Sequence, residues 1–125
     1  MILIVDDQFY NREPLKRLLN RSGYRAEGTS SGEEALWLAH MAKPDLVVLD
    51  EMMPGMTGME VLRKLRSEPE MVDVPVIMYS AAEPGEKRGE AKQLGAEWLT
   101  KGYIHWSELL ERIEEVCGDC RAVDD

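Results

Sequence analysis

Five polar side chains directly follow or end apolar segments, and their types suit the binding of a divalent cation or a phosphate. Three of them are carboxylates, one is a hydroxyl and one is an ammonium. Carboxylate oxygens are the ligands that Mg²⁺, Mn²⁺ and Ca²⁺ prefer, and a set without His or Cys does not suit zinc or copper. The five residues are Asp6, Asp7, Asp50, Ser80 and Lys101.

Short apolar runs alternate with longer segments of helical periodicity along the whole chain. Strands joined by helices of this length pair in parallel through right-handed crossovers. We therefore predict an α/β fold, a doubly wound five-stranded parallel sheet in the order 2-1-3-4-5 with helices on both faces. The predicted strands are 2–5, 24–28, 45–50, 74–80 and 97–100, and the predicted helices are 10–22, 30–42, 57–68, 83–96 and 104–117.

Local signals set the expected helix ends. Ser31 with Glu34 and Thr57 with Glu60 have the spacing of capping boxes. Pro14 lacks an N–H and suits a first helical turn, so the regular part of the first helix should begin near residue 11. The segment 83–96 contains two glycines, each costing about 1 kcal/mol relative to alanine inside a helix. We therefore expect the fourth helix to be the least stable element.

The predicted strand order brings the three carboxylates together. Ligands of open parallel sheets bind beyond the carboxyl ends of the strands, where the strand order reverses. At about 4 Å and an effective dielectric of about 20, two carboxylates repel by roughly 4 kcal/mol. Such a cluster needs a bound proton or a cation. The alternative is that Asp6 and Asp7 are solvated turn residues, but the additional acid, hydroxyl and lysine at the same edge favour a site.

Composition limits the class of protein. The 125 residues suit one domain, and 44% of them are hydrophobic. The formal net charge is −9, whereas nucleic-acid binding depends on basic residues, so we expect no direct nucleic-acid partner. No segment approaches the roughly 20 apolar residues that span a bilayer. The first residues are too short and too acidic for a signal peptide, so we expect a cytoplasmic protein without membrane insertion.

The two cysteines, Cys117 and Cys120, form a C-x-x-C pair near the end of the last predicted helix. Two thiols supply half of a zinc site, and a redox pair normally begins a helix rather than ending one. We expect Cys117 to pack in the core and Cys120 to be an incidental thiol, although a redox or metal role stays open.

Four motifs together identify a family. The chain resembles the receiver domain of two-component response regulators, with the chemotaxis-regulator-like, flavodoxin-like fold, through "VDD", "LDEMMPG", "YSA" and "LTKG". The resemblance covers nearly the whole chain, in order and with the expected spacing. It implies a receiver domain over 1–118, followed by a polar C-terminal tail at 119–125.

The resemblance implies the roles of the site residues. Asp50 would accept a phosphoryl group from a histidine kinase or phosphotransfer protein, in two-component signalling or a phosphorelay. Mg²⁺ (or Mn²⁺) would be held by the carboxylates of Asp6, Asp7 and Asp50 and by the backbone carbonyl of Met52. Lys101 and Ser80 would contact the phosphoryl group. The contact of Ser80 would form only once that group is present. The fourth helix, fifth strand and fifth helix would present the face for a downstream protein.

Three positions depart from the family pattern. Gly102 replaces the usual proline after the lysine, so we expect a trans peptide bond there and a looser loop. Trp98 occupies the position of the switch aromatic, and its bulk should hinder a buried rotamer; the alternative is that it only covers the strand edge. Met52 orients water poorly, so we expect slow loss of the phosphoryl group. The neighbouring Glu51 either faces solvent or supports the site.

Two other functions compete with the switch. An aspartyl-nucleophile phosphatase of the haloacid-dehalogenase type would need an acid at position 52, which is Met52 here. An interaction module that had lost phosphorylation would not need all five site residues. We therefore predict a regulatory domain that catalyses only its own phosphorylation and dephosphorylation, and not an enzyme acting on other substrates.

Overall fold

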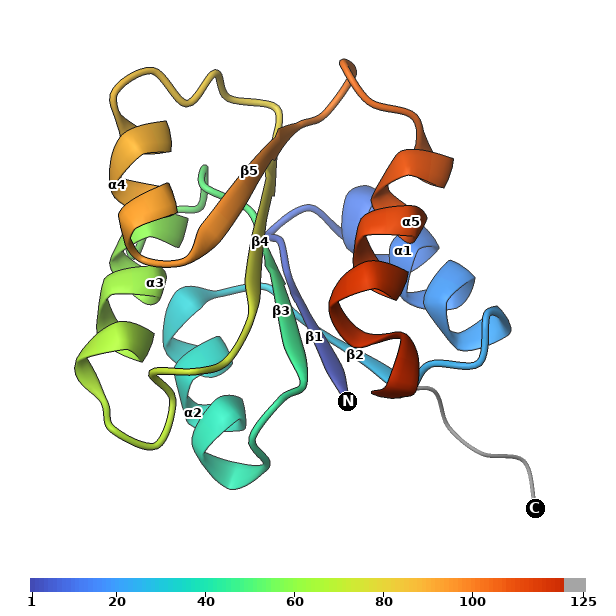
Figure 1. Cartoon of the computed structure of the whole chain (residues 1–125), viewed down its shortest axis with the longest axis horizontal. Coiled ribbons are helices and arrows are strands. Elements are labelled where there is room, and N and C mark those ends of the chain that lie inside the picture. Colours follow the sequence, from blue (N-terminus) through green and yellow to red (C-terminus); the bar gives the residue numbers. More distant parts are fainter. Residues whose placement is uncertain (121–125) are drawn as a thin grey trace.

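Five parallel strands form one sheet in the order β2-β1-β3-β4-β5, with helices on both faces (Figure 1). The computed structural model describes residues 1–120. The predicted fold class and strand order are confirmed. The strands are β1 (Ile2–Val5), β2 (Ala26–Thr29), β3 (Leu46–Leu49), β4 (Val76–Ser80) and β5 (Ala96–Thr100). The helices are α1 (Phe9–Arg21), α2 (Gly32–Met41), α3 (Gly58–Ser67), α4 (Lys87–Gln93) and α5 (Trp106–Cys117), followed by the 3-10 turn η1 (Gly118–Cys120).

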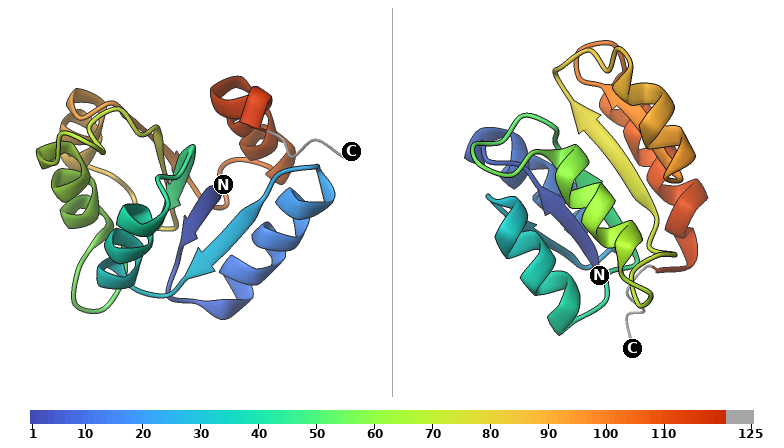
Figure 2. Two further views of the ribbon diagram at one scale, coloured as in Figure 1. Left: turned by 90° about the horizontal axis from the view of Figure 1, so that it is seen from below. Right: turned by 90° about the vertical axis from the view of Figure 1, so that its left-hand side faces the viewer.

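The sheet separates two apolar cores, which Figure 2 shows as two helix layers around the strands. Helices α2, α3 and α4 pack on one face, and α1 and α5 pack on the other. Every residue of β1, β3 and β4 is buried, because these central strands contact helices on both sides. The edge strand β2 is more polar and partly exposed, which matches its composition.

The observed bounds of α1 and α4 differ from those predicted from the sequence. Helix α1 begins at Phe9, so Pro14 lies in the second turn and the predicted start near residue 11 is wrong. The missing N–H of Pro14 leaves one helical hydrogen bond unmade without ending the helix. Helix α4 is shorter than predicted, because Pro84 and the positive φ of Gly85 (+52°) keep the preceding residues out of the helix.

Both predicted N-terminal caps are present. The hydroxyl of Ser31 accepts a hydrogen bond from the backbone N–H of Glu34, and Thr57 does the same for Glu60, each at 3.2 Å. The cap at Thr57 is followed by Gly58, where a Cβ would lie 2.2 Å from the carbonyl oxygen of Asp50. The loop after β3 therefore passes so close to the start of α3 that only glycine fits.

The end of α5 accounts for the cysteines. Cys117 is buried against the α1–α5 core, as predicted, and burial raises the pKa of its thiol to about 12. Cys120 is half-buried beside it in η1, so it is not a freely exposed thiol. Residues 119 and 120 of the predicted tail belong to this turn, and residues 121–125 lie outside the described part of the chain. Within residues 1–120, no helix has the length and apolar character needed to cross a membrane.

Candidate functional site

Three carboxylates meet where two neighbouring strands end. Oxygens of Asp6, Asp7 and Asp50 lie within 4.8 Å of one another. The pairing of Val5 with Leu49 places the ends of β1 and β3 side by side. Backbone hydrogen bonds continue past the strands, since the N–H of Asp50 donates to the carbonyl of Val5 at 2.9 Å. The parallel register therefore brings the acids of two distant segments into one cluster.

Lys101 closes the cluster from the end of β5. Its Nζ lies 2.6 Å from Oδ2 of Asp6, and both side chains are largely buried. The same ammonium lies 5.3 Å from the ring centre of Tyr79, a cation–π contact on the opposite side. The backbone N–H of Gln8 donates to the other oxygen of Asp6 at 2.9 Å. Lys101 thus offsets part of the repulsion among the three acids.

The environment of Asp50 disfavours its charged form. Burial raises the pKa of the Asp50 carboxyl, and the neighbouring Asp6 raises it further. Lys101 acts in the opposite direction, as do hydrogen bonds from the Ser80 hydroxyl and from the backbone N–H of Glu51. The net direction of the pKa shift is upward, so a cation bound beside Asp50 would favour its charged form.

Asp7 provides the test of whether the residues fit a divalent cation. Its Oδ1 is buried and accepts no hydrogen bond from any residue in the described part of the chain. A buried carboxylate oxygen without a partner is costly, and a hard cation satisfies it. Together with the oxygens of Asp6 and Asp50, it forms a set of ligands that fits Mg²⁺. Met52 lies in the same loop as Asp50, with its side chain 65% exposed.

A cavity of about 210 Å³ opens beside the cluster on the α1–α5 side. Asp50 and Lys101 line its polar wall, while Leu15, Val48 and Tyr79 form an apolar wall. The cavity therefore leaves space beside the Asp50 carboxylate for a small polar group and for water.

Ser80 and Trp98 are linked through one loop residue. Ser80 is completely buried, and its Oγ accepts a hydrogen bond from the N–H of Ala82 at 3.3 Å. Trp98 is 3% exposed, and its Nε1 donates to the carbonyl of Ala82 at 3.3 Å. The expectation that bulk hinders burial of Trp98 is therefore wrong, whereas its role as a switch, or as a cover of the strand edge, stays a prediction. The indole belongs to the core cluster that also contains Met78, Ala91 and Ala96.

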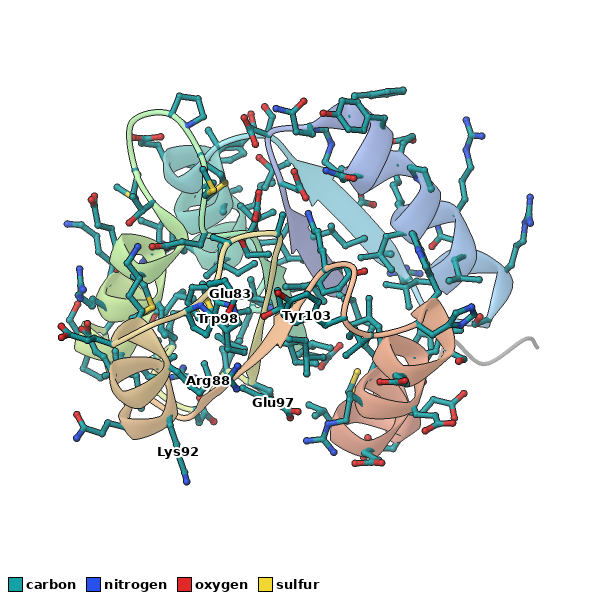
Figure 3. The ribbon with its side chains drawn as sticks, turned by 90° about the horizontal axis from the view of Figure 1, so that it is seen from above. Glu83, Arg88, Lys92, Glu97, Trp98 and Tyr103 are labelled. Atoms are coloured by element: carbon teal, nitrogen blue, oxygen red, sulfur yellow. The ribbon has the colours of Figure 1, made fainter. Side chains whose placement is uncertain are left out.

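The peptide bond after Lys101 follows the prediction, whereas the looser loop stays a prediction. The peptide bond between Lys101 and Gly102 is trans, and Gly102 has a φ of +88°. Tyr103 is 75% exposed, and its hydroxyl donates to Glu83 at 2.5 Å. Figure 3 shows Glu83 and Tyr103 beside Trp98 on this side of the molecule. The hydrogen bond therefore joins the loop after β4 to the loop after β5.

Glu51 is the residue whose place the sequence left open. Its side chain is 3% exposed and supports the loop rather than facing solvent. One oxygen accepts from the backbone N–H of Met59 at 2.8 Å, and the other lies 2.7 Å from Nζ of Lys87. The contact with Met59 has a signal in the sequence, namely a carboxylate between a buried strand and a helix N-terminus. No feature of the neighbouring sequence indicates the contact with Lys87.

Comparisons with known proteins agree with this geometry. Residues 2–114 match the family model of the response regulator receiver domain. Response regulator MprA of Mycolicibacterium vanbaalenii is 41% identical over 113 residues, covering 90% of this chain and 48% of that protein. MprA of Mycobacterium ulcerans is 37% identical over 125 residues, with 99% and 53% covered. The chain thus spans about half the length of these relatives.

Solved structures with the same fold include chemotaxis protein CheY4 of Vibrio cholerae, with a TM-score of 0.83 and 33% identity over 92% of this chain and 96% of that one. Response regulator TrrA of Thermotoga maritima, solved in complex with Mg²⁺ and BeF, has a TM-score of 0.79 and 34% identity over 92% and 96%. Because the family model matches residues 2–114 of this chain, the chain belongs to the response regulator receiver domains.

Proposed function

We propose that this chain is a phosphorylation-dependent signalling switch in which Asp50 is the phosphoacceptor. An oxygen of Asp50 attacks the phosphorus of a phosphohistidine on a histidine kinase or phosphotransfer protein. The P–N bond breaks, the imidazole leaves, and an acyl phosphate forms on Asp50. The observation that carries this proposal is the convergence of two further carboxylates, those of Asp6 and Asp7, and the ammonium of Lys101 around the buried Asp50.

The remaining site residues have complementary roles. Asp6, Asp7, Asp50 and the backbone carbonyl of Met52 would hold Mg²⁺ or Mn²⁺, which when bound neutralises charge on the phosphoryl oxygens. Lys101 supplies a second positive charge, and its electrostatic effect on the Asp50 carboxyl supports this role. The transferring group spreads negative charge over its oxygens, so positioning and neutralisation supply most of the catalysis.

Ser80 gives the switch its sensitivity to phosphorylation. Its hydroxyl lies close enough to lower the pKa of the Asp50 carboxyl, and it would hydrogen-bond an oxygen of the phosphoryl group only once that group is present. A contact that differs between two states shifts the equilibrium between them. Ser80 and Trp98 both bond to Ala82, so a shift at Ser80 reaches the loop before α4 and the buried indole. A downstream protein would then read the face formed by α4, β5 and α5.

The receiver domain would extend over 1–118, with a polar segment at 119–125 outside it. The competing functions have less support. A phosphatase of the aspartyl-nucleophile type needs a general acid near Asp50, and the exposed thioether of Met52 cannot donate a proton. An interaction module without phosphorylation leaves the buried, unsatisfied Oδ1 of Asp7 without a reason.

Incubation with acetyl phosphate and Mg²⁺ tests the proposal. We expect the intact mass to increase by one phosphoryl group, and Asp50→Ala to show no increase. Fluorescence of the buried Trp98 should change with the same time course. An unchanged wild-type mass would refute the switch, and continuous turnover of phosphomonoesters would favour the phosphatase.

A further inference from the structure

Glu51 directly follows the phosphoacceptor in the chain, and its carboxylate is buried with two partners. Its carbonyl accepts from the N–H of Gly58 at 3.1 Å. Its side chain contacts the N–H of Met59 at 2.8 Å and Nζ of Lys87 at 2.7 Å. One residue therefore adjoins the phosphoacceptor through its main chain and contacts a cation of α4 with its side chain.

Helix α4 has few other attachments. It has seven residues, and Ala91 is its only buried one. Glu86 at its N-cap makes no side-chain capping hydrogen bond, and Gly89 lowers its intrinsic helicity. Glu90, which also lies in its first turn, pairs with Arg63 of α3 at 2.6 and 2.7 Å. Lys87, the first residue of the helix, pairs with Glu51, so two separate ion pairs hold this turn.

We propose that the Glu51–Lys87 ion pair is a positioning contact that ties the first turn of α4 to the loop carrying Asp50, and that transmits phosphorylation to α4. The coupling half of this inference rests on the proposed function. A phosphoryl group on Asp50 adds bulk and negative charge next to the main chain of Glu51, whose carbonyl is fixed by the N–H of Gly58 at 3.1 Å. Because the loop is confined by the close approach of Gly58 to the Asp50 carbonyl, a shift of Glu51 moves its side chain and the attached Lys87.

Electrostatics limit the expected effect. Lys87 is 53% exposed, so solvent screens its half of the pair. Arg63 also senses the charge of Glu51, and it remains as a second cation when Lys87 is removed. Loss of Lys87 should therefore loosen α4 without unfolding the domain. In Lys87→Met, the buried carboxylate of Glu51 is left with Arg63 as a weaker partner. Adding Glu51→Gln to this variant removes the buried charge, while the amide oxygen still accepts from the backbone N–H of Met59.

Hydrogen exchange of the α4 amides, with and without acetyl phosphate and Mg²⁺, tests the proposal. In Lys87→Met we expect roughly fivefold faster exchange in α4 before phosphorylation, and at most about half of the wild-type change after it. Lys87→Arg should behave like the wild type. The matched control is Lys92→Met, since Lys92 lies on the same helix and points to solvent (Figure 3).

Four outcomes decide the matter. Slower unphosphorylated exchange in Lys87→Met/Glu51→Gln than in Lys87→Met would support the buried ion pair as the anchor. Equal α4 exchange in wild type, Lys87→Met and Lys92→Met would overturn the anchoring. A wild type that gains the phosphoryl group, with Lys87→Met showing the same α4 response, would overturn the coupling alone. A wild type that gains no phosphoryl group would overturn the proposed function and the coupling, whereas the unphosphorylated comparison would still decide the anchoring.

Discussion

Replacing the phosphoacceptor by its uncharged isostere should stabilise the fold. Asp50→Asn keeps the shape of the side chain and an acceptor for Ser80, but removes one of three carboxylates whose oxygens lie within 4.8 Å. Burial is the main reason that the pKa of Asp50 is raised, and Asp6 adds to it. At neutral pH, without a divalent cation, the wild type therefore carries a charge that folding disfavours.

The magnitude follows from the geometry. At the 4.8 Å limit of the cluster and an effective dielectric of about 20, each carboxylate pair repels by about 3.5 kcal/mol. Asp50 takes part in two such pairs, and attraction to Lys101 offsets about one of them. Solvent near the half-exposed Asp7 reduces the remainder. We expect Asp50→Asn to be more stable by about 1–3 kcal/mol, or roughly 5–10 °C in Tm.

The pH dependence has a definite sign. The ordinary pKa of this carboxyl is 3.8, and the folded value lies above it. The protonated Asp50 carboxyl favours the folded state below about pH 4, and this contribution to stability is lost as the pH rises through the folded pKa. The advantage of Asp50→Asn should thus be complete at pH 7 and vanish in acid. Mg²⁺ at about 100 times its Kd should stabilise the wild type by about 2.7 kcal/mol and reduce or reverse the difference.

Urea unfolding followed by tryptophan fluorescence, in chelator and in Mg²⁺, measures these differences. Asp50→Ala is an imperfect substitute, because it also leaves a cavity and removes the acceptor for Ser80. Equal stability of wild type and Asp50→Asn at pH 7 in chelator, or a less stable variant, would refute the electrostatic reasoning.

Three further predictions concern the site and its scaffold. Lys101→Met should slow phosphorylation by acetyl phosphate about 100-fold, because one charge on the phosphoryl oxygens is lost; a mass-spectrometric rate within threefold of the wild type would contradict this. Gly58→Ala should cost about 2–3 kcal/mol in urea unfolding, since its Cβ would lie 2.2 Å from the Asp50 carbonyl oxygen, whereas Gly89→Ala, which meets open space, should gain about 0.5–1 kcal/mol. Met52→Asn should shorten the phosphoryl half-life about tenfold, because an amide orients water; an unchanged decay of the phosphorylated mass would refute that role.

The places where sequence reasoning failed share a physical cause. Helix α4 is shorter than its periodicity predicts, because the turn at Pro84 and Gly85 is decided by where the chain must leave β4. Trp98 is buried because it packs with residues of β4 and α4 in one core cluster, a property of packing between elements rather than of β5 itself. The sequence leaves two environments open for Glu51, solvent or the site. Its partner Lys87 lies on α4, far from the Glu51 loop in the chain.

By itself, the sequence determined the strand order, the two helix layers and the identity of the five polar residues at the strand ends. These follow from short-range periodicity, from the handedness of βαβ crossovers and from the rule that parallel strands end at one edge. Only the tertiary structure decided which acid Lys101 pairs with, which oxygen of Asp7 has no partner and how Glu51 reaches α4. Partner choice depends on distances of a few ångströms between segments far apart in the chain, and local propensity carries no information about them.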